Sequence, residues 1–218
     1  MKKHIICFGD SNTHGYCADP RDCADGGDRF NEEERWPCLL QKALGDDYLV
    51  IEEGLNGRTT CFDDPLREGA SGLQMLAPVL QSHKPVDLLI LMLGTNDCKK
   101  RFSNNAYTIS LGMERLIDQA KALPVWSPGA AGILVIAPPA IREEMLKSPA
   151  VEDMGPEAVE ISRRLAKKYA FACLNHGCRF LDANGIVEMN PVDGMHFTGR
   201  GHSQLAERLS QLIPTIIG

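Results

Sequence analysis

A serine stands in a tight turn directly after the first apolar segment of the chain. Residues 5–12 read Ile-Ile-Cys-Phe-Gly-Asp-Ser-Asn, so the apolar run stops at Gly9 and Asp10, and Ser11 follows in the turn. A strand that ends in such a turn exposes one hydroxyl at the edge of a sheet, where a substrate can reach it. Ser11 is therefore a candidate nucleophile.

A later segment contains the groups that a nucleophilic serine requires. In Asp193-Gly194-Met195-His196, a carboxylate precedes an imidazole by three residues. A serine hydroxyl is too weakly acidic to react alone at neutral pH, so it needs a base such as His196. The base needs an acceptor on its other nitrogen, and Asp193 can face it within one turn. His14 is nearer to Ser11 in sequence and could line a pocket, but it has no obvious carboxylate partner.

Amide donors follow two other predicted strands. The tetrahedral intermediate of acyl transfer has a negative oxygen that needs hydrogen-bond donors. The candidates are the backbone N–H groups of Ser11 and Gly57 and the side-chain amide of Asn96. Gly57 has no side chain, so its N–H can approach a ligand closely. A simpler interpretation of Asn96 is that it only caps the helix after the third strand.

Apolar segments bounded by turn residues alternate with helical stretches along the whole chain. The predicted strands are 4–8, 48–52, 86–93, 132–137 and 179–181. The predicted helices are 34–44, 73–82, 109–122, 156–176 and 201–213. Nearly continuous apolar strands are typical of parallel sheets covered on both faces. This alternation predicts an α/β fold in one domain, 1–218: a doubly wound parallel five-stranded sheet flanked by helices.

The candidate residues follow different strands, and the strand order decides whether they meet. With the flavodoxin-like order 2-1-3-4-5, the first three strands are neighbours at the switch point where open sheets bind ligands. Ser11, Gly57 and Asn96 would then converge on one crevice. Two longer connections could shape it: 17–31, rich in Asp and Gly, and 138–156, which has apolar Ile141 and Met145 among charged residues. Because Ile141 and Met145 are four residues apart, we expect a helical turn whose apolar face must be buried. The segment could shape an acyl pocket, form an oligomer contact, or both; alternatively, it packs on its own domain.

The composition excludes several other classes of protein. The formal net charge of -6 argues against a nucleic-acid-binding or anionic-membrane surface. No run approaches the roughly 18 apolar residues of a membrane span. The eight cysteines form no Cys-x-x-Cys pair, so we expect reduced thiols and no metal site. The apolar run after the basic N-terminus is too short for a signal peptide, so we expect a cytoplasmic protein.

Four sequence blocks closely resemble the SGNH, or GDSL-type, hydrolase family. In chain order they are Gly9-Asp10-Ser11-Asn12, the segment 52–60 with Gly57, Gly94-Thr95-Asn96-Asp97, and Asp193-Gly194-Met195-His196. Glu-Glu-Gly-x-x-x-Arg-Thr-Thr and Met-Leu-Gly-Thr-Asn-Asp resemble the compact bacterial arylesterase and acyltransferase branch. One departure is Asn12, where the family often has leucine. Asn12 borders the site, and this departure leaves only the polarity of the pocket open.

The resemblance assigns a role to each candidate residue. It implies that Ser11 is the nucleophile, His196 the base and Asp193 its orienting acid. It also implies that Gly57 and Asn96 complete the oxyanion hole with Ser11.

Three functions fit this pattern. The first is a serine ester hydrolase acting on small acyl or aryl esters without metal or cofactor. The second is an acyltransferase or perhydrolase that passes the acyl group to alcohol or peroxide, since the resemblance implies that members of this branch can do so. The resemblance also implies a possible homo-oligomer. The third is a silent hydrolase fold that only binds ligands, which an intact triad argues against.

Overall fold

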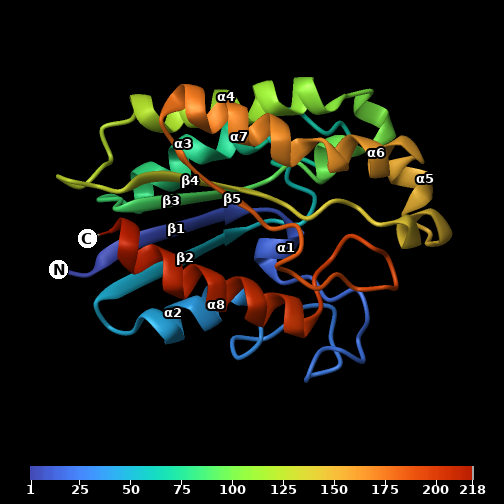
Figure 1. Ribbon diagram of the computed structural model, residues 1–218, viewed down its shortest axis with the longest axis horizontal. Helices are drawn as coiled ribbons and strands as arrows, with labels where there is room; N and C mark the ends of the chain where they lie inside the picture. Colours follow the sequence, from blue (N-terminus) through green and yellow to red (C-terminus); the bar gives the residue numbers. More distant parts are fainter. Residues whose placement is uncertain (218) are drawn as a thin grey trace.

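A parallel sheet of five strands forms the centre of the protein (Figure 1). The computed structural model describes residues 1–217. The strand order is β2-β1-β3-β4-β5, and every pairing is parallel. The strands are β1 (Lys3–Gly9), β2 (Tyr48–Gly54), β3 (Leu88–Met92), β4 (Gly132–Ala137) and β5 (Arg179–Asp182). The predicted fold class, a single-domain doubly wound sheet of flavodoxin-like order, is confirmed.

Helices cover both faces of the sheet. In Figure 1, α2 and α8 lie on one face, and α3, α4 and α7 lie on the other. The α-helices are α1 (Ser11–His14), α2 (Trp36–Leu44), α3 (Gly72–Ser82), α4 (Ala106–Ala122), α5 (Val151–Met154), α6 (Glu157–Arg163), α7 (Leu165–His176) and α8 (Gly199–Ile216). Three short 3-10 helices are η1 (Asn96–Cys98), η2 (Lys100–Phe102) and η3 (Glu143–Lys147).

The central strands are apolar on both sides because each side packs in a separate core. Along β1, Ile6 and Phe8 face the core under α3, α4 and α7, while Ile5 and Cys7 face the core under α2 and α8. This alternation follows from the two-residue period of a strand. Cys7 is fully buried as a small apolar side chain.

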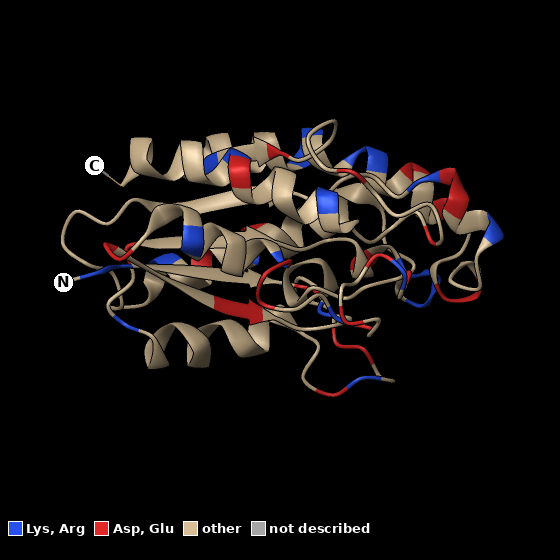
Figure 2. Cartoon of the chain, turned by 90° about the horizontal axis from the view of Figure 1, so that it is seen from below, with Lys and Arg blue, Asp and Glu red and all other residues tan. Residues whose placement is uncertain are grey.

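Charged residues lie mainly outside this sheet. Figure 2 shows them on the helices and loops, whereas the strands are largely uncharged. Within residues 1–217, none of the helices is both long and apolar enough to cross a membrane.

Capping and backbone breaks move two helix boundaries from their predicted places. Helix α4 begins at Ala106, earlier than predicted, because Asn105 caps it in a capping box with Thr108. The single helix predicted over 156–176 is two helices, α6 and α7, which meet at Arg164.

The 138–156 segment buries its apolar face. It contains η3 and α5, and its apolar side chains are buried: Ile141 is 1% exposed and Met145 is fully buried. Of the alternatives for these two side chains, packing on the same domain is the one observed. The segment packs on its own domain, where Ile141 N–H donates to Ser162 Oγ and Arg142 N–H donates to the Gly194 carbonyl.

Candidate active site

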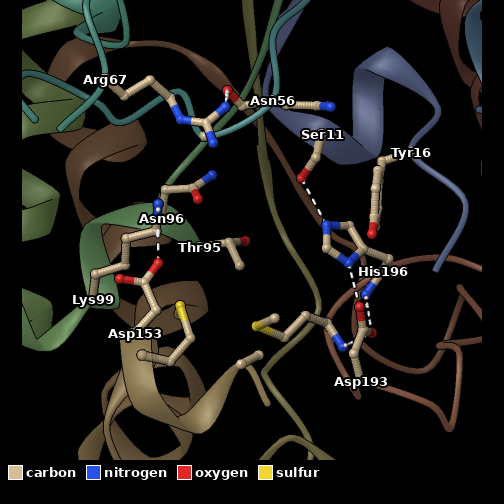
Figure 3. Close-up of a pocket in the computed structure, with 14 residues that line it drawn as sticks. Ser11, Tyr16, Asn56, Arg67, Thr95, Asn96, Lys99, Asp153, Asp193 and His196 are labelled. Atoms are coloured by element: carbon tan, nitrogen blue, oxygen red, sulfur yellow. Dashed lines mark hydrogen bonds and ion pairs between the residues drawn. The ribbon is translucent and has the colours of Figure 1, made fainter. Parts of the chain in front are cut away.

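Ser11 begins a short helix at the carboxyl end of β1. The Asp10 side chain accepts a hydrogen bond from Asn12 N–H at 3.0 Å, which caps this turn. Gly15 ends it in the left-handed conformation, with φ of 90°. The chain therefore turns sharply within a few residues of the strand. Ser11 is 9% exposed and its hydroxyl faces a pocket (Figure 3).

A continuous hydrogen-bonded chain joins Ser11 to a carboxylate. Ser11 Oγ lies 2.9 Å from His196 Nε2, across 185 residues of sequence. His196 Nδ1 lies 2.5 Å from Asp193 Oδ2 (Figure 3). Because an ionised carboxylate only accepts hydrogen bonds, Nδ1 has the proton and Nε2 is left to accept from the Ser11 hydroxyl. The structure thus brings together the three residues that the sequence selected.

The surroundings of Asp193 keep it ionised and in place. Burial alone would raise its pKa, but the His196 hydrogen bond and charge and two backbone N–H groups lower the pKa below its ordinary value. Those N–H groups belong to Met195 and His196 and donate to Oδ1 at 2.9 and 3.1 Å. The Tyr16 ring lies against His196, with ring centroids 4.6 Å apart. Asp193 and Tyr16 together fix the orientation of the imidazole.

Asn12 borders the site and holds the segment that contains His196. It is 2% exposed and does not line the pocket. Its Nδ2 donates to the Met195 carbonyl at 3.1 Å, and its Oδ1 accepts from Phe197 N–H at 3.0 Å. Both ends of its amide thus bind the backbone on either side of His196.

The three residues expected to provide the oxyanion donors, Ser11, Gly57 and Asn96, all line the pocket. Within the described part of the chain, neither Ser11 N–H nor Gly57 N–H donates to a protein acceptor. Asn96 Nδ2 donates to the Arg58 carbonyl at 3.2 Å, which leaves its second amide hydrogen available. The capping interpretation of Asn96 is wrong, since Asn105 caps α4. The expected oxyanion donors therefore lie together on the pocket wall.

The position of Gly57 requires glycine for two reasons. Its φ is 83°, in the left-handed region. A Cβ added there would lie 2.7 Å from Cδ and Nε of Arg67. The Arg67 side chain therefore lies directly over the Gly57 backbone.

Two buried carboxylates stand behind these elements. Burial raises the pKa of Asp10 and of Asp97 to about 6. Asp97 accepts hydrogen bonds from Thr60 N–H and Oγ, which joins η1 to the loop that contains Gly57. The Oδ2 atom of Asp10 has no partner among the described residues.

The pocket has a volume of about 350 Å³. Besides the candidate residues it is lined by side chains that sequence reasoning did not select: Tyr16, Asn56, Arg67, Thr95, Lys99, Ala150, Asp153, Met154 and Met195. His14, considered as a lining residue, is not one of them. Within residues 1–217, no group of three or more His, Cys, Asp or Glu is arranged to hold a metal ion.

The GDSL-like lipase/acylhydrolase family matches this sequence over residues 7–204. The chain belongs to this family. A sequence comparison with curated proteins gives no significant match.

Solved structures of similar proteins agree with this assignment. The M. smegmatis aryl esterase is 34% identical, with a TM-score of 0.88 and coverage of 98% of this chain and 99% of that one. Est24, a carbohydrate acetylesterase from Sinorhizobium meliloti, is 32% identical, with a TM-score of 0.87 and the same coverage. A putative arylesterase from Agrobacterium tumefaciens is 32% identical, with a TM-score of 0.84, and also has that coverage. The GDSL protein described here is a carboxylic ester hydrolase.

Proposed function

We propose that this esterase cleaves small acyl esters of aryl or sugar alcohols through an acyl-enzyme on Ser11. The observation that carries the proposal is the unbroken chain from Ser11 Oγ through His196 to Asp193, at 2.9 and 2.5 Å. Ser11, Gly57 and Asn96, whose N–H groups are the expected oxyanion donors, line the same pocket. A base and oxyanion donors on two sides of one hydroxyl are the two requirements of acyl transfer.

The first half of the reaction forms the acyl-enzyme. Ser11 Oγ attacks the ester carbonyl carbon while its proton moves to His196 Nε2. The carbonyl oxygen becomes an oxyanion and accepts hydrogen bonds from Ser11 N–H, Gly57 N–H and Asn96 Nδ2. The intermediate collapses when the alcohol oxygen leaves with the proton from His196. Asp193 stabilises the imidazolium that forms in between.

The second half regenerates the enzyme. Water takes the place of the alcohol, gives a proton to His196 and attacks the acyl carbon through the same kind of oxyanion. The carboxylic acid then leaves as Ser11 Oγ recovers its proton. Asp193 remains an anion throughout, in keeping with its lowered pKa.

The size and lining of the pocket favour small substrates. About 350 Å³ accommodates a short acyl chain and one ring, and Ala150, Met154 and Met195 provide apolar surface. The aryl esterase and the carbohydrate acetylesterase with similar structures are named for small esters of this kind. Their names support an aryl or sugar acetate as the substrate class.

The variant Ser11→Ala tests this mechanism with p-nitrophenyl acetate. We expect the rate to fall by roughly 10⁴- to 10⁶-fold because the attacking oxygen is gone. Ser82→Ala, an exposed serine at the end of α3, is the matched control and should leave the rate unchanged. Mass spectrometry after rapid quenching should find one acetyl group on Ser11 in the wild type. A near-wild-type rate in folded Ser11→Ala would overturn the proposal.

A further inference from the structure

One wall of the pocket has more positive charge than the ester chemistry requires. Arg67 lies over Gly57, next to the proposed oxyanion hole. Its Nη1 donates to the Asn56 carbonyl at 2.9 Å. Its Nε and Nη2 have no acceptor, and it forms no ion pair, within residues 1–217. Figure 3 shows the guanidinium on the side of the cavity across from His196.

Lys99 adds a second cation to the same wall. It is 7% exposed, and its Nζ lies 3.6 Å from Asp153 Oδ2 and 3.8 Å from Asp64 Oδ2. Both distances exceed a hydrogen bond. Arg101 already binds both carboxylates, with 2.7 Å to Asp64. The Lys99 ammonium thus retains donors for a ligand.

The lining cations of this wall differ in their partners. Lys99 shares Asp64 and Asp153 with Arg101, which does not itself line the pocket. The other acidic side chain that lines the pocket, Asp193, is bonded to His196 on the opposite side. Within residues 1–217, Arg67 is therefore the lining cation that has no acidic partner.

We propose that Arg67, assisted by Lys99, binds a carboxylate at the far end of the acyl group. This inference rests on the proposed function, which fixes how the substrate lies. The alcohol oxygen must be near His196 Nε2 to receive its proton, and the carbonyl oxygen lies at the proposed donors of Gly57 and Asn96. The acyl chain is then the part of the substrate that can extend past these donors toward the wall across from His196. That wall contains Arg67 and Lys99. A planar guanidinium binds a carboxylate through two parallel N–H groups. The preferred substrates are half-esters of short dicarboxylic acids.

Paired substrates that differ only in charge test this specificity. We compare kcat/KM for the p-nitrophenyl half-esters of succinate, glutarate and adipate with kcat/KM for the corresponding neutral p-nitrophenyl methyl diesters. For the best chain length, we expect the wild type to favour the anion by roughly 10- to 100-fold, the range of a charge-assisted hydrogen bond. A second pair, 4-acetoxyphenylacetate and its methyl ester, places the carboxylate on the alcohol side instead.

Variants identify the residue responsible. Arg67→Gln should lower the anion-to-neutral ratio by about tenfold or more, mainly through KM. Arg67→Lys keeps the charge but not the two parallel donors, so it should keep an intermediate ratio. Arg208→Gln is the control. It removes an exposed arginine of α8, a helix that does not line the pocket, and should leave the ratio unchanged.

The outcomes separate this proposal from the proposed function. If neutral esters are cleaved in a Ser11-dependent way but the wild-type ratio is one or less for every half-ester, the carboxylate subsite is wrong and the esterase mechanism stands. A preference seen only with 4-acetoxyphenylacetate overturns the placement on the acyl side. If Ser11→Ala keeps full activity on all these esters, the proposed function itself fails.

Discussion

At the scale of single residues, Asn96 is the donor whose contribution can be measured most directly. Arg58 carbonyl holds its amide in place, so one N–H is aimed without further rearrangement. Asn96→Ala should lower kcat by about 10²–10³, or about 2.7–4 kcal/mol, the usual loss for one oxyanion donor. Steady-state kinetics with p-nitrophenyl acetate measure it.

Asn105→Ala is the matched control for this experiment. Asn105 caps α4, so its loss should cost about 1 kcal/mol of stability and leave kcat near the wild-type value. A change in kcat of less than about threefold in Asn96→Ala would remove Asn96 from the proposed oxyanion hole.

Asp10 offers a test of buried charge. Its pKa is raised to about 6 by burial, so between pH 4 and 6 the folded protein binds this proton more tightly than the unfolded chain does. Stability from this group is therefore lost as pH rises through that window, by roughly 3 kcal/mol. Asp10→Asn removes the titrating carboxyl, so the variant should not lose this stability. The difference in free energy of unfolding in urea, Asp10→Asn minus wild type, should therefore increase by roughly 3 kcal/mol between about pH 4 and pH 7. A difference independent of pH would contradict the raised pKa.

At the scale of elements, the sequence was sufficient for the strands and for most helices. Segments such as 132–137 are apolar, short and bounded by turn residues, which leaves few alternatives to a buried parallel strand. Ser11, Gly57 and Asn96 were found because each follows a strand, and their convergence depended on the strand order, which is confirmed. Asp193 and His196 were found by their spacing in sequence.

The elements that were not predicted depend on tertiary contacts. Nothing in local periodicity separates α6 from α7. The surface that buries the apolar residues of 138–156 was left open because their partners lie far along the chain. Arg67 and Lys99 gave no signal either. Their place on the pocket wall results from the turn at 64–67 and from η1, and neither turn has a sequence pattern that reveals its direction.

The 138–156 segment makes a prediction of its own, because Ala150 and Met154 line the pocket. Met154→Ala should open space for a longer acyl chain. The ratio of kcat/KM for p-nitrophenyl hexanoate to kcat/KM for p-nitrophenyl acetate should rise about tenfold. One methylene group in an apolar pocket typically changes kcat/KM by about 10- to 200-fold. Met145→Ala is the control, since Met145 is buried in the same segment but does not line the pocket. An equal shift of the ratio in both variants would indicate general loosening instead.

At the scale of the whole molecule, the site joins segments from the two ends of the chain. Ser11 and Asn12 contact residues 195–197 across 185 or 183 residues of sequence. Gly57 and Asn96 are placed by β2 and β3, on either side of β1. No single element contains enough of the site to keep its geometry, so the site should exist only while the complete sheet is folded.

Chemical unfolding tests this dependence on the whole fold. The chain has two tryptophans, and Trp36 is fully buried, with Nε1 donating to the Asn12 carbonyl at 3.1 Å. In a Trp126→Phe variant, fluorescence therefore reports the core directly behind Ser11. We expect esterase activity, Trp36 fluorescence and far-ultraviolet circular dichroism to fall together at one urea midpoint, as in a two-state transition. Activity could instead be lost at a clearly lower urea concentration, with fluorescence unchanged. The segment with His196 would then detach on its own, despite the two side-chain hydrogen bonds that join Asn12 to Met195 and Phe197.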